Sequence, residues 1–264
     1  LWSRGLGDVY KRQVFGYEVI HFNFGTTMTM PSLPVAPATS SLWYLVLRGA
    51  HSAYSELLQR LELALLRLFK RHVLITYQGD DARQGDRSKD LFAESIAHHV
   101  DSTYYFPQSD SAKRRRIARV SRVATSIFFV NPDLQYFLPS SAQFVPYGHI
   151  KLTEETQLEE RNQLRPLRLG HAPSHREAKG TAIIQQVVTE LQNEGAEIDF
   201  VLIENIPHGQ MRTALGSVDV LIDQMYAGWY GGISVEAMDL GIPVLSYIRH
   251  SDLLSVDEQM STDL

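Results

Sequence analysis

Apolar residues in the second half of the chain form short runs that alternate with longer amphipathic stretches. Short apolar runs bounded by turn residues favour buried strands, and apolar positions three and four residues apart favour helices. We predict strands at Leu167–His171, Ile198–Ile203, Val218–Ile222 and Pro243–Tyr247, and helices over Gly180–Asn193, from Pro207, and up to Leu240. Strands that alternate with helices of this length pair in parallel through right-handed crossovers. The pattern therefore predicts a doubly wound α/β sheet.

The first half follows the same pattern less regularly. Its predicted strands are Tyr17–Phe24, His72–Tyr77, Ile127–Val130 and Gln143–Pro146, and its predicted helices are Ser55–Phe69 and Ser109–Ser126. The proline-rich stretch Pro31–Pro37 cannot continue regular structure and is a predicted loop. We expect an α/β fold of two Rossmann-like, doubly wound lobes, over residues 14–150 and 166–264, joined by a polar linker at 151–165.

Composition narrows the classes of partner. The chain has 264 residues, a formal net charge of -5 and no cysteine. It therefore lacks a global basic field for nucleic acid, and it has neither disulfides nor thiolate metal ligands. Its apolar runs are far shorter than the roughly 20 residues of a membrane-spanning helix. The local basic run Lys113–Arg116 is typical of a solvated helix face. A small-molecule or neutral substrate is favoured.

Two adjacent glycines open the predicted helix that ends at Leu240. Glycines let a ligand approach the backbone, and the amide groups and positive dipole end of a helix start suit a diphosphate. The carboxylate of Glu236, about one turn further on, can accept hydrogen bonds from ribose hydroxyls. Glycines also open helices for purely structural reasons, and that alternative stays open. The candidate contacts here are Gly231, Gly232, Ile233 and Ser234.

The predicted loop after strand Leu167–His171 carries the second group of candidate residues. Arg176 and Lys179 can converge on phosphates and offset the charge of a departing nucleoside diphosphate. An exposed polar loop without a ligand is the alternative. His171 and His175 are four residues apart, but Pro173 lies between them, so we expect no helical metal pair and no metal site.

Three segments of the second half resemble one enzyme family. They read His-Ala-Pro-Ser-His-Arg-Glu-Ala-Lys-Gly-Thr at 171–181, Leu-Ile-Glu-Asn-Ile-Pro-His at 202–208 and Val-Glu-Ala-Met-Asp-Leu-Gly-Ile-Pro-Val at 235–244. They are similar to the donor lobe of group 1 glycosyltransferases, the large retaining family with the two-lobed GT-B fold. The resemblance covers residues 167 to about 247 and makes 166–264 the donor lobe.

The resemblance implies roles for individual residues. Arg176 and Lys179 would hold the donor diphosphate, and Glu236 would bind the donor ribose. The strand end from Glu204 to Ile206 lies where such enzymes contact the base, and His171 belongs to the same donor-binding set. The first half, by implication the acceptor lobe, is similar to the family through Ile-Thr-Tyr-Gln-Gly-Asp-Asp at 75–81, among other segments.

The sequence departs from the family at two positions. The family's first glutamate stands eight positions before the second, where this chain has Gly228. A histidine often precedes the glycine of the first-lobe loop, where this chain has Gln78. Asp80 and Asp81 are the nearest candidates to orient or deprotonate an acceptor hydroxyl, and a turn-stabilising role for one of them is the alternative.

The implied function is transfer of a sugar from a nucleoside-diphosphate sugar to an acceptor hydroxyl. We expect a hexosyltransferase-type enzyme that retains configuration and uses neither metal nor cofactor, consistent with the absence of any Asp-x-Asp metal-bridging pair. A catalytically silent nucleotide-sugar-binding protein and a GT-B sugar-nucleotide epimerase stay open. The acceptor is a glycan, a lipid or a protein. We expect a cytoplasmic location in glycan biosynthesis, with peripheral membrane contact left open.

The two ends of the sequence carry an expectation of their own. Residues 1–13 resemble a translated sequencing-library adapter and are excluded from the fold. We expect both lobes to be truncated, and a fragment of this kind to bind its donor with or without catalysis.

Overall fold

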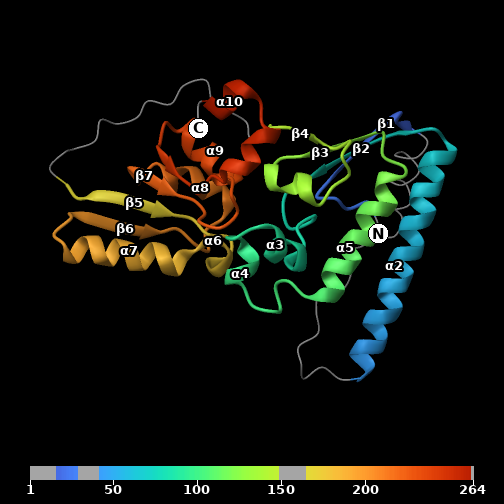
Figure 1. Ribbon diagram of the computed structural model, residues 1–264, viewed down its shortest axis with the longest axis horizontal. Coiled ribbons are helices and arrows are strands. Elements are labelled where there is room, and N and C mark those ends of the chain that lie inside the picture. The colour runs from blue at the N-terminus through green and yellow to red at the C-terminus, as the bar shows by residue number, and fades with distance from the viewer. Residues whose placement is uncertain (1–15, 29–41, 149–164, 263–264) are drawn as a thin grey trace. The chain divides into compact units, whose positions relative to one another are not determined.

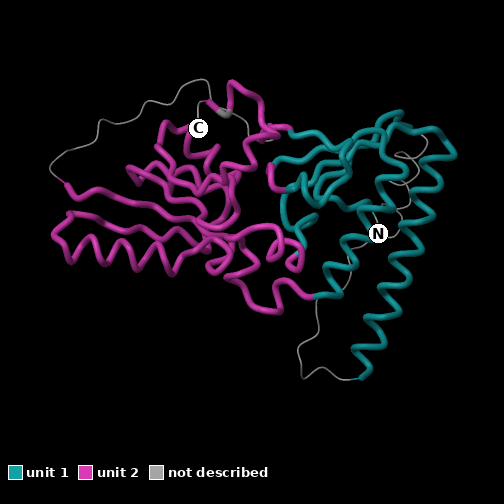
Figure 2. Tube along the Cα trace, in the orientation of Figure 1, with its two compact units in different colours: residues 1–84, 107–130, 134–144 teal, residues 85–106, 131–133, 145–264 magenta. Residues whose placement is uncertain are grey.

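The computed structural model describes residues 16–28, 42–148 and 165–262 (Figure 1). By their contacts the residues form two units (Figure 2). Unit 1 comprises residues 1–84, 107–130 and 134–144, and unit 2 comprises 85–106, 131–133 and 145–264. The expectations for residues 1–13, for Pro31–Pro37 and for all of the linker except Arg165 fall outside the described residues.

Unit 1 contains a four-stranded parallel sheet. Its strands β1 (Val19–Asn23), β2 (His72–Tyr77), β3 (Ser126–Phe129) and β4 (Gln143–Phe144) lie in chain order. They are connected by α2 (Leu42–Leu68), α5 (Pro107–Ser121) and the 3₁₀ turn η1 (Pro132–Tyr136). Leu66 of α2, Val120 of α5 and Ile75 of β2 have no exposed surface. The predicted strands of this half are confirmed, and α5 ends five residues before its predicted end.

Helix α2 has an unusual distribution of polarity. It begins at Leu42, not at the predicted Ser55. Its buried side includes Gln59, which accepts a hydrogen bond from Arg119 Nη1 at 2.6 Å. Its outer side exposes apolar residues, among them Leu57 at 55% and Leu61 at 53%. Among the residues that the structure describes, no helix, α2 included, is both long enough and apolar enough to cross a membrane.

Unit 2 contains a second parallel sheet, with the strand order β6-β5-β7-β8. The strands are β5 (Leu167–His171), β6 (Ile198–Leu202), β7 (Val220–Ile222) and β8 (Val244–Leu245), and the connecting helices are α6 (Arg176–Lys179), α7 (Thr181–Asn193), α8 (His208–Leu215) and α9 (Gly232–Asp239). The remaining elements are α3 (Gly85–Leu91), α4 (Ile96–His99), η2 (His250–Ser255) and α10 (Glu258–Thr262). The chain runs outward from β5 to β6 and then returns across β5 to β7. The predicted strands and helices of this half are confirmed, apart from α6, where we expected a loop.

The two faces of this sheet carry separate cores. On one face Leu169 packs with Ile184 and Val188 of α7. On the other face Leu221 packs with Leu215 of α8 and with residues of α9. Successive strand residues point to opposite faces, and Leu221 pairs with Gly170, the neighbour of Leu169, so Leu169 and Leu221 face opposite sides. Helices therefore cover both sides of the sheet, as in a doubly wound fold.

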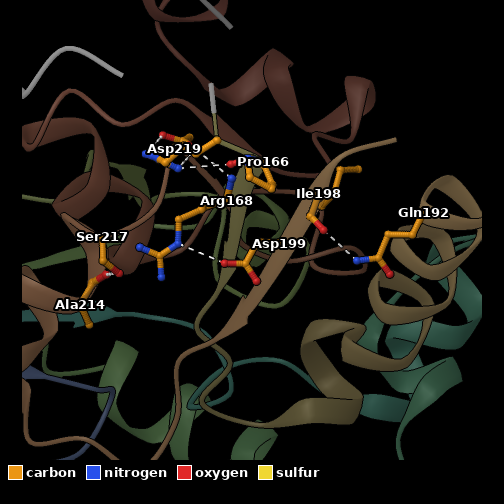
Figure 3. Close-up of polar contacts among 9 residues, drawn as sticks. Pro166, Arg168, Gln192, Ile198, Asp199, Ala214, Ser217 and Asp219 are labelled. Atoms are coloured by element: carbon orange, nitrogen blue, oxygen red, sulfur yellow. Dashed lines mark hydrogen bonds and ion pairs between the residues drawn. The ribbon is translucent and has the colours of Figure 1, made fainter. Parts of the chain in front are cut away.

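Charged residues secure the amino-terminal end of the unit 2 sheet (Figure 3). The carboxylate of Asp219 accepts two hydrogen bonds from the Arg165 guanidinium, at 2.8 and 2.6 Å, and one from the Arg168 backbone N–H at 2.8 Å. The Arg168 side chain reaches Asp199 on the neighbouring strand, with Nε 3.3 Å from Oδ2. This end of the sheet is therefore tied by ion pairs, and the opposite end carries the candidate site.

Candidate functional site

The candidate site lies at the carboxyl ends of β5 and β7. These strands are neighbours, and the chain leaves them in opposite directions, which makes the point between them the topological switch point of the sheet. His171 is the last residue of β5, and Asp223 follows the last residue of β7. Ligands of open α/β sheets bind in the crevice at such a point.

A buried carboxylate organises this end of the sheet. The Asp223 side chain is 0% exposed, and its Oδ1 accepts a hydrogen bond from Lys179 Nζ at 2.7 Å. Its Oδ2 accepts one from Ser234 Oγ at 2.7 Å and one from the Gly231 backbone N–H. The structure thus brings together three sequence-predicted residues, Lys179, Gly231 and Ser234, around an aspartate that the sequence analysis missed.

A side chain at position 231 would be crowded. A Cβ there would lie 3.0 Å from both Lys179 Nζ and Asp223 Oδ2, so one of these side chains would have to shift. The close approach of the ammonium to the backbone therefore favours glycine at this position. The Gly231 N–H donates to Asp223.

Lys179 is the accessible member of its ion pair. Its side chain keeps 15% exposure, whereas that of Asp223 has none. Its Nζ donates to Asp223 among the residues that the structure describes. Because an ammonium has three N–H donors, this bond leaves donors that can meet a ligand. The positive end of the α9 dipole adds to the lysine charge at this point. The arrangement is chemically suited to an anion that approaches from solvent.

His171 is a structural residue of the site. It is fully buried, and its Nδ1 donates to the carbonyl oxygen of Ile222 at 2.7 Å. Its Nε2 then accepts a hydrogen bond from the Thr181 hydroxyl at 3.0 Å. Burial lowers the pKa of the imidazole, so the neutral form is favoured. The ring pins β5 to β7 and to the start of α7, directly beside Asp223.

Arg176 lies on the same short helix as Lys179 but has a different partner. Its Nε donates to the Glu204 carboxylate, 2.8 Å from Oε1 and 3.2 Å from Oε2. This hydrogen bond raises the pKa of Arg176 and lowers that of Glu204. Arg176 is 59% exposed and Glu204 18%, so the guanidinium is held in place and is still accessible. Ile206, two residues further, packs on the core instead.

Glu236 occupies the second turn of α9. Its side chain is 24% exposed, and Oε1 lies 3.5 Å from Nε2 of His208, the first residue of α8. His208 is 88% exposed and leaves the carboxylate accessible. The structure therefore places Glu236 on the helix that Gly231 caps, about half a turn from Ser234 and about one and a half turns from Gly231.

Gly228 stands at the position of the family's first glutamate, and the side chain of Arg249 occupies the space beside it. Gly228 has a φ of +78°, and a Cβ there would lie 2.5 Å from Arg249 Nη1. Nη1 donates to Asp252 at 2.7 Å, Nη2 donates to the carbonyl oxygen of Glu94 at 2.9 Å, and the guanidinium lies 3.9 Å from the centre of the Phe92 ring. Backbone conformation and this buried arginine together exclude an acidic side chain at position 228.

Residues 85–106 place aromatic side chains against rings beside α6, an arrangement that the sequence did not predict. His99 of α4 stacks on Tyr226, with ring centres 3.6 Å apart, and Tyr104 meets His175 edge to face at 4.8 Å. The His175 ring accepts a hydrogen bond from Ala178 N at 3.4 Å and so caps α6. These contacts fix the helix that carries Arg176 and Lys179. Histidine is an uncommon cap residue, so the sequence offered no clear signal.

Asp80 and Asp81 lie in unit 1, after β2. The Asp81 carboxylate accepts hydrogen bonds from the backbone N–H of Gly79 at 2.7 Å and of Gln78 at 3.1 Å. Burial raises the pKa of Asp81, and these backbone bonds oppose the shift. Asp80 is 40% exposed and lies 3.7 Å from Arg83. The structure gives Asp81 the turn-stabilising role that the sequence analysis left open.

The basic run of α5 supports the same turn. Lys113 Nζ donates to the Arg83 carbonyl oxygen at 2.7 Å, and Arg116 Nη2 donates to the Asp81 carbonyl oxygen at 2.9 Å. The expectation that this run is merely a solvated helix face is wrong for these two residues. Because they satisfy carbonyl groups of the loop, they hold the chain that follows β2.

Comparisons with known proteins add little to this geometry. No protein-family model matches the sequence, and a search among curated proteins found no match. Among solved structures, the chain is similar to one titled "Crystal Structure Analysis of the Glycotransferase of kitacinnamycin", with a TM-score of 0.34, 12% sequence identity, and coverage of 85% of this chain and 69% of that chain. A likeness at this TM-score assigns neither fold nor function to this chain.

Proposed function

We propose that the protein is a glycosyltransferase of the retaining, group 1 GT-B type, and that unit 2 binds its nucleoside-diphosphate sugar. The observation that carries the proposal is the convergence of Lys179, Gly231 and Ser234 at the switch point of the unit 2 sheet. A cation beside a helix amino terminus, at the carboxyl ends of parallel strands, is an arrangement suited to a diphosphate.

Each donor group has a counterpart in the proposed site. Lys179 and the first turn of α9, including Gly232 and Ile233, face the diphosphate. Arg176, held by Glu204, adds a second cation at its edge. The Glu236 carboxylate accepts hydrogen bonds from the ribose hydroxyls. The segment after β6, from Glu204 to Ile206, lies beside the base. His171 does not touch the ligand in this proposal, because it is fully buried and pins the strands beneath.

In the proposed reaction, the protein provides electrostatic stabilisation of the leaving group. Transfer to an acceptor hydroxyl leaves a nucleoside diphosphate with more negative charge on its terminal phosphate than in the intact donor. Lys179 and Arg176 offset that added charge, so they stabilise the transition state more than the bound substrate. The reaction as proposed retains configuration and needs neither metal nor cofactor.

A titration of the whole chain with UDP, GDP and ADP tests the donor site. The Lys179→Met variant is compared with Lys89→Met, which changes an exposed lysine of α3 in the same unit. We expect one diphosphate to bind, with affinity reduced at least about ten-fold by Lys179→Met, in line with loss of a charge-assisted contact, and unchanged by Lys89→Met. A folded sample that binds none of the three contradicts the proposal.

A second candidate function is donor binding without transfer. Two observations favour it. Arg249 excludes an acid at position 228, and the Asp81 carboxylate is committed to the backbone N–H groups of Gln78 and Gly79. Incubation of the chain with the nucleotide sugar whose diphosphate binds distinguishes the two functions. Release of free diphosphate above the rate of a Lys179→Met sample supports transferase chemistry, and tight binding without release supports the silent binder.

A further inference from the structure

The Asp223 carboxylate makes the interactions of a bound anion although it is part of the chain. A lysine ammonium, a backbone N–H at the start of α9 and a serine hydroxyl all donate to it. The Asp223 carboxylate has no exposed surface, so a ligand does not contact it directly. Lys179, whose side chain keeps 15% exposure, is the partner that a ligand can contact. The Lys179 ammonium thus donates to a buried carboxylate on one side and can donate to an anion from solvent on another.

Anchoring changes what a lysine contributes to binding. A free lysine side chain has about 2 kcal/mol of rotamer entropy, which it loses when it orders around a ligand. The 2.7 Å contact from Lys179 Nζ to Asp223 Oδ1 already restricts that freedom, and it uses one of three N–H donors. The remaining donors are held beside Gly231, where a Cβ would lie 3.0 Å from Nζ.

The position of Lys179 Nζ, beside Gly231 at the amino-terminal end of α9, determines which part of a nucleotide the lysine meets. Glu236, the proposed ribose contact, lies five residues after Gly231 on the chain, which is about 7.5 Å along a helix axis. A ribose at Glu236 leaves the first phosphate short of Lys179, and a second phosphate extends the ligand toward it. An anchored Lys179 therefore adds more to the affinity for a diphosphate than for a monophosphate.

We propose that Asp223 is the positioning residue that gives this site its preference for a nucleoside diphosphate over the monophosphate. The inference rests on the proposed donor site and specifies how one of its residues works. Asp223 acts through Lys179, and it holds the ammonium and the first turn of α9 in register with each other. No bond to the ligand is made by Asp223 itself.

A carboxylate is required at position 223 because both of its oxygens accept. An asparagine has one accepting oxygen and one donating amide, so it faces either Lys179 or the Gly231 and Ser234 donors with the wrong group. Asp223→Asn therefore disrupts one side of the cluster. Asp199→Asn makes the same chemical change at a carboxylate that is 57% exposed and pairs with Arg168 at the opposite end of the sheet, which makes it the matched control.

The test is calorimetric titration of the whole chain with the diphosphate and monophosphate of each nucleoside, UDP with UMP, GDP with GMP, and ADP with AMP. We expect Asp223→Asn to lower the ratio of diphosphate to monophosphate affinity on the order of ten-fold, the lower end of what removing the partner that orients a binding group costs in metal sites. Monophosphate affinity stays unchanged. Asp199→Asn keeps the wild-type ratio within about two-fold, as expected of a surface substitution away from the site.

A double variant separates positioning from general damage. In the Lys179→Met background the lysine is absent, so Asp223→Asn should produce no further fall in the affinity ratio. Equal loss of monophosphate and diphosphate affinity in Asp223→Asn, or a full additional fall in the double variant, would overturn the inference. Near-ultraviolet circular dichroism verifies that each variant is folded.

Failure of the inference is distinguishable from failure of the proposed function. If the wild-type chain binds no nucleotide, both are wrong. If it binds, and Lys179→Met lowers the ratio but Asp223→Asn does not, only the role of Asp223 is wrong. Should Asp223→Asn not fold, Asp223→Glu keeps the charge and displaces the carboxylate by one methylene group, and the same fall in the ratio is expected.

Discussion

Arg249 fills the space beside Gly228, with Nη1 2.5 Å from the point where a Cβ at that position would lie. Gly228 also has a φ of +78°, a conformation that side chains with a Cβ rarely adopt. The backbone conformation and the packing of Arg249 therefore both require glycine at position 228. The arginine in turn is held by Asp252 and by the Glu94 carbonyl oxygen.

We predict that Gly228→Ala lowers the free energy of unfolding by about 2 kcal/mol or more, through backbone strain and displacement of the buried guanidinium. Gly209→Ala is the matched control, because Gly209 lies in α8 with open space around its α-carbon. The control should be neutral or stabilising by up to about 1 kcal/mol. Urea denaturation followed by circular dichroism measures both, and equal effects would contradict the argument.

His171 predicts a pH dependence of stability. Burial lowers its pKa in the folded state below the ordinary value, so the unfolded chain binds the proton more readily. The neutral His171 contributes fully to the free energy of unfolding above about pH 6.5. This contribution is lost as the pH falls from there to the lowered folded-state pKa. Over that interval the free energy of unfolding falls by up to about 1.4 kcal/mol per pH unit.

Denaturation at several pH values compares the wild type with His171→Asn and with His208→Gln, which changes a histidine that is 88% exposed. The slope assigned to His171 should disappear from His171→Asn and persist in His208→Gln. An unchanged slope in His171→Asn would show that another group causes it.

The exposed apolar side of α2 predicts concentration-dependent association of the purified chain. Leu57 and Leu61 are more than half exposed, so replacing both by Glu should change the free energy of unfolding by no more than about 0.5 kcal/mol per site. Association measured by light scattering should fall, because the apolar patch is interrupted by charge. Ile183→Glu with Val187→Glu on α7 is the control of equal charge. A loss of several kcal/mol in the α2 variant alone would show that this face is covered.

Arg176 predicts a salt-sensitive contribution to nucleotide binding. It is 59% exposed, so its attraction for a diphosphate is screened by salt more strongly than that of Lys179, which is 15% exposed. Arg176→Ala should weaken diphosphate binding several-fold at low salt, with the difference shrinking at roughly 0.5 M salt. Arg168→Ala, at the opposite end of β5, should leave binding unchanged. Equal effects of the two variants would place the ligand elsewhere.

Much of the fold could be predicted because strands and helices that bury an apolar face leave a periodic trace in the sequence. The predicted bounds of β2 and β5 match the structure. The start of α2 was missed for the opposite reason: its first turns expose Leu42 at 78% and Trp43 at 73%, so they carry no buried stripe to detect. Helix α6 has four residues, too few for any period.

The candidate site was predictable only in part. Glycines at a helix start and cations after a strand are local signals, and Lys179, Gly231 and Ser234 do lie together. Asp223 was missed because its importance depends on β7 lying beside β5, a relationship between segments about 50 residues apart in the chain. Gly228 was recognised as an exception, but its cause, Arg249, follows only from the structure.

The path of the chain through its two units limits how the protein can be divided. Residues 85–106 lie in unit 2, yet they precede α5 and β3 of unit 1 in the sequence. They supply Ile96 to the core that contains Ala178 and Ala227, and Phe92 and Glu94 to the contacts of Arg249. Expression of residues 166–264 alone would therefore yield a sheet whose α6 lacks its covering layer, and reconstitution of unit 2 from fragments would need residues 85–106 as a separate piece.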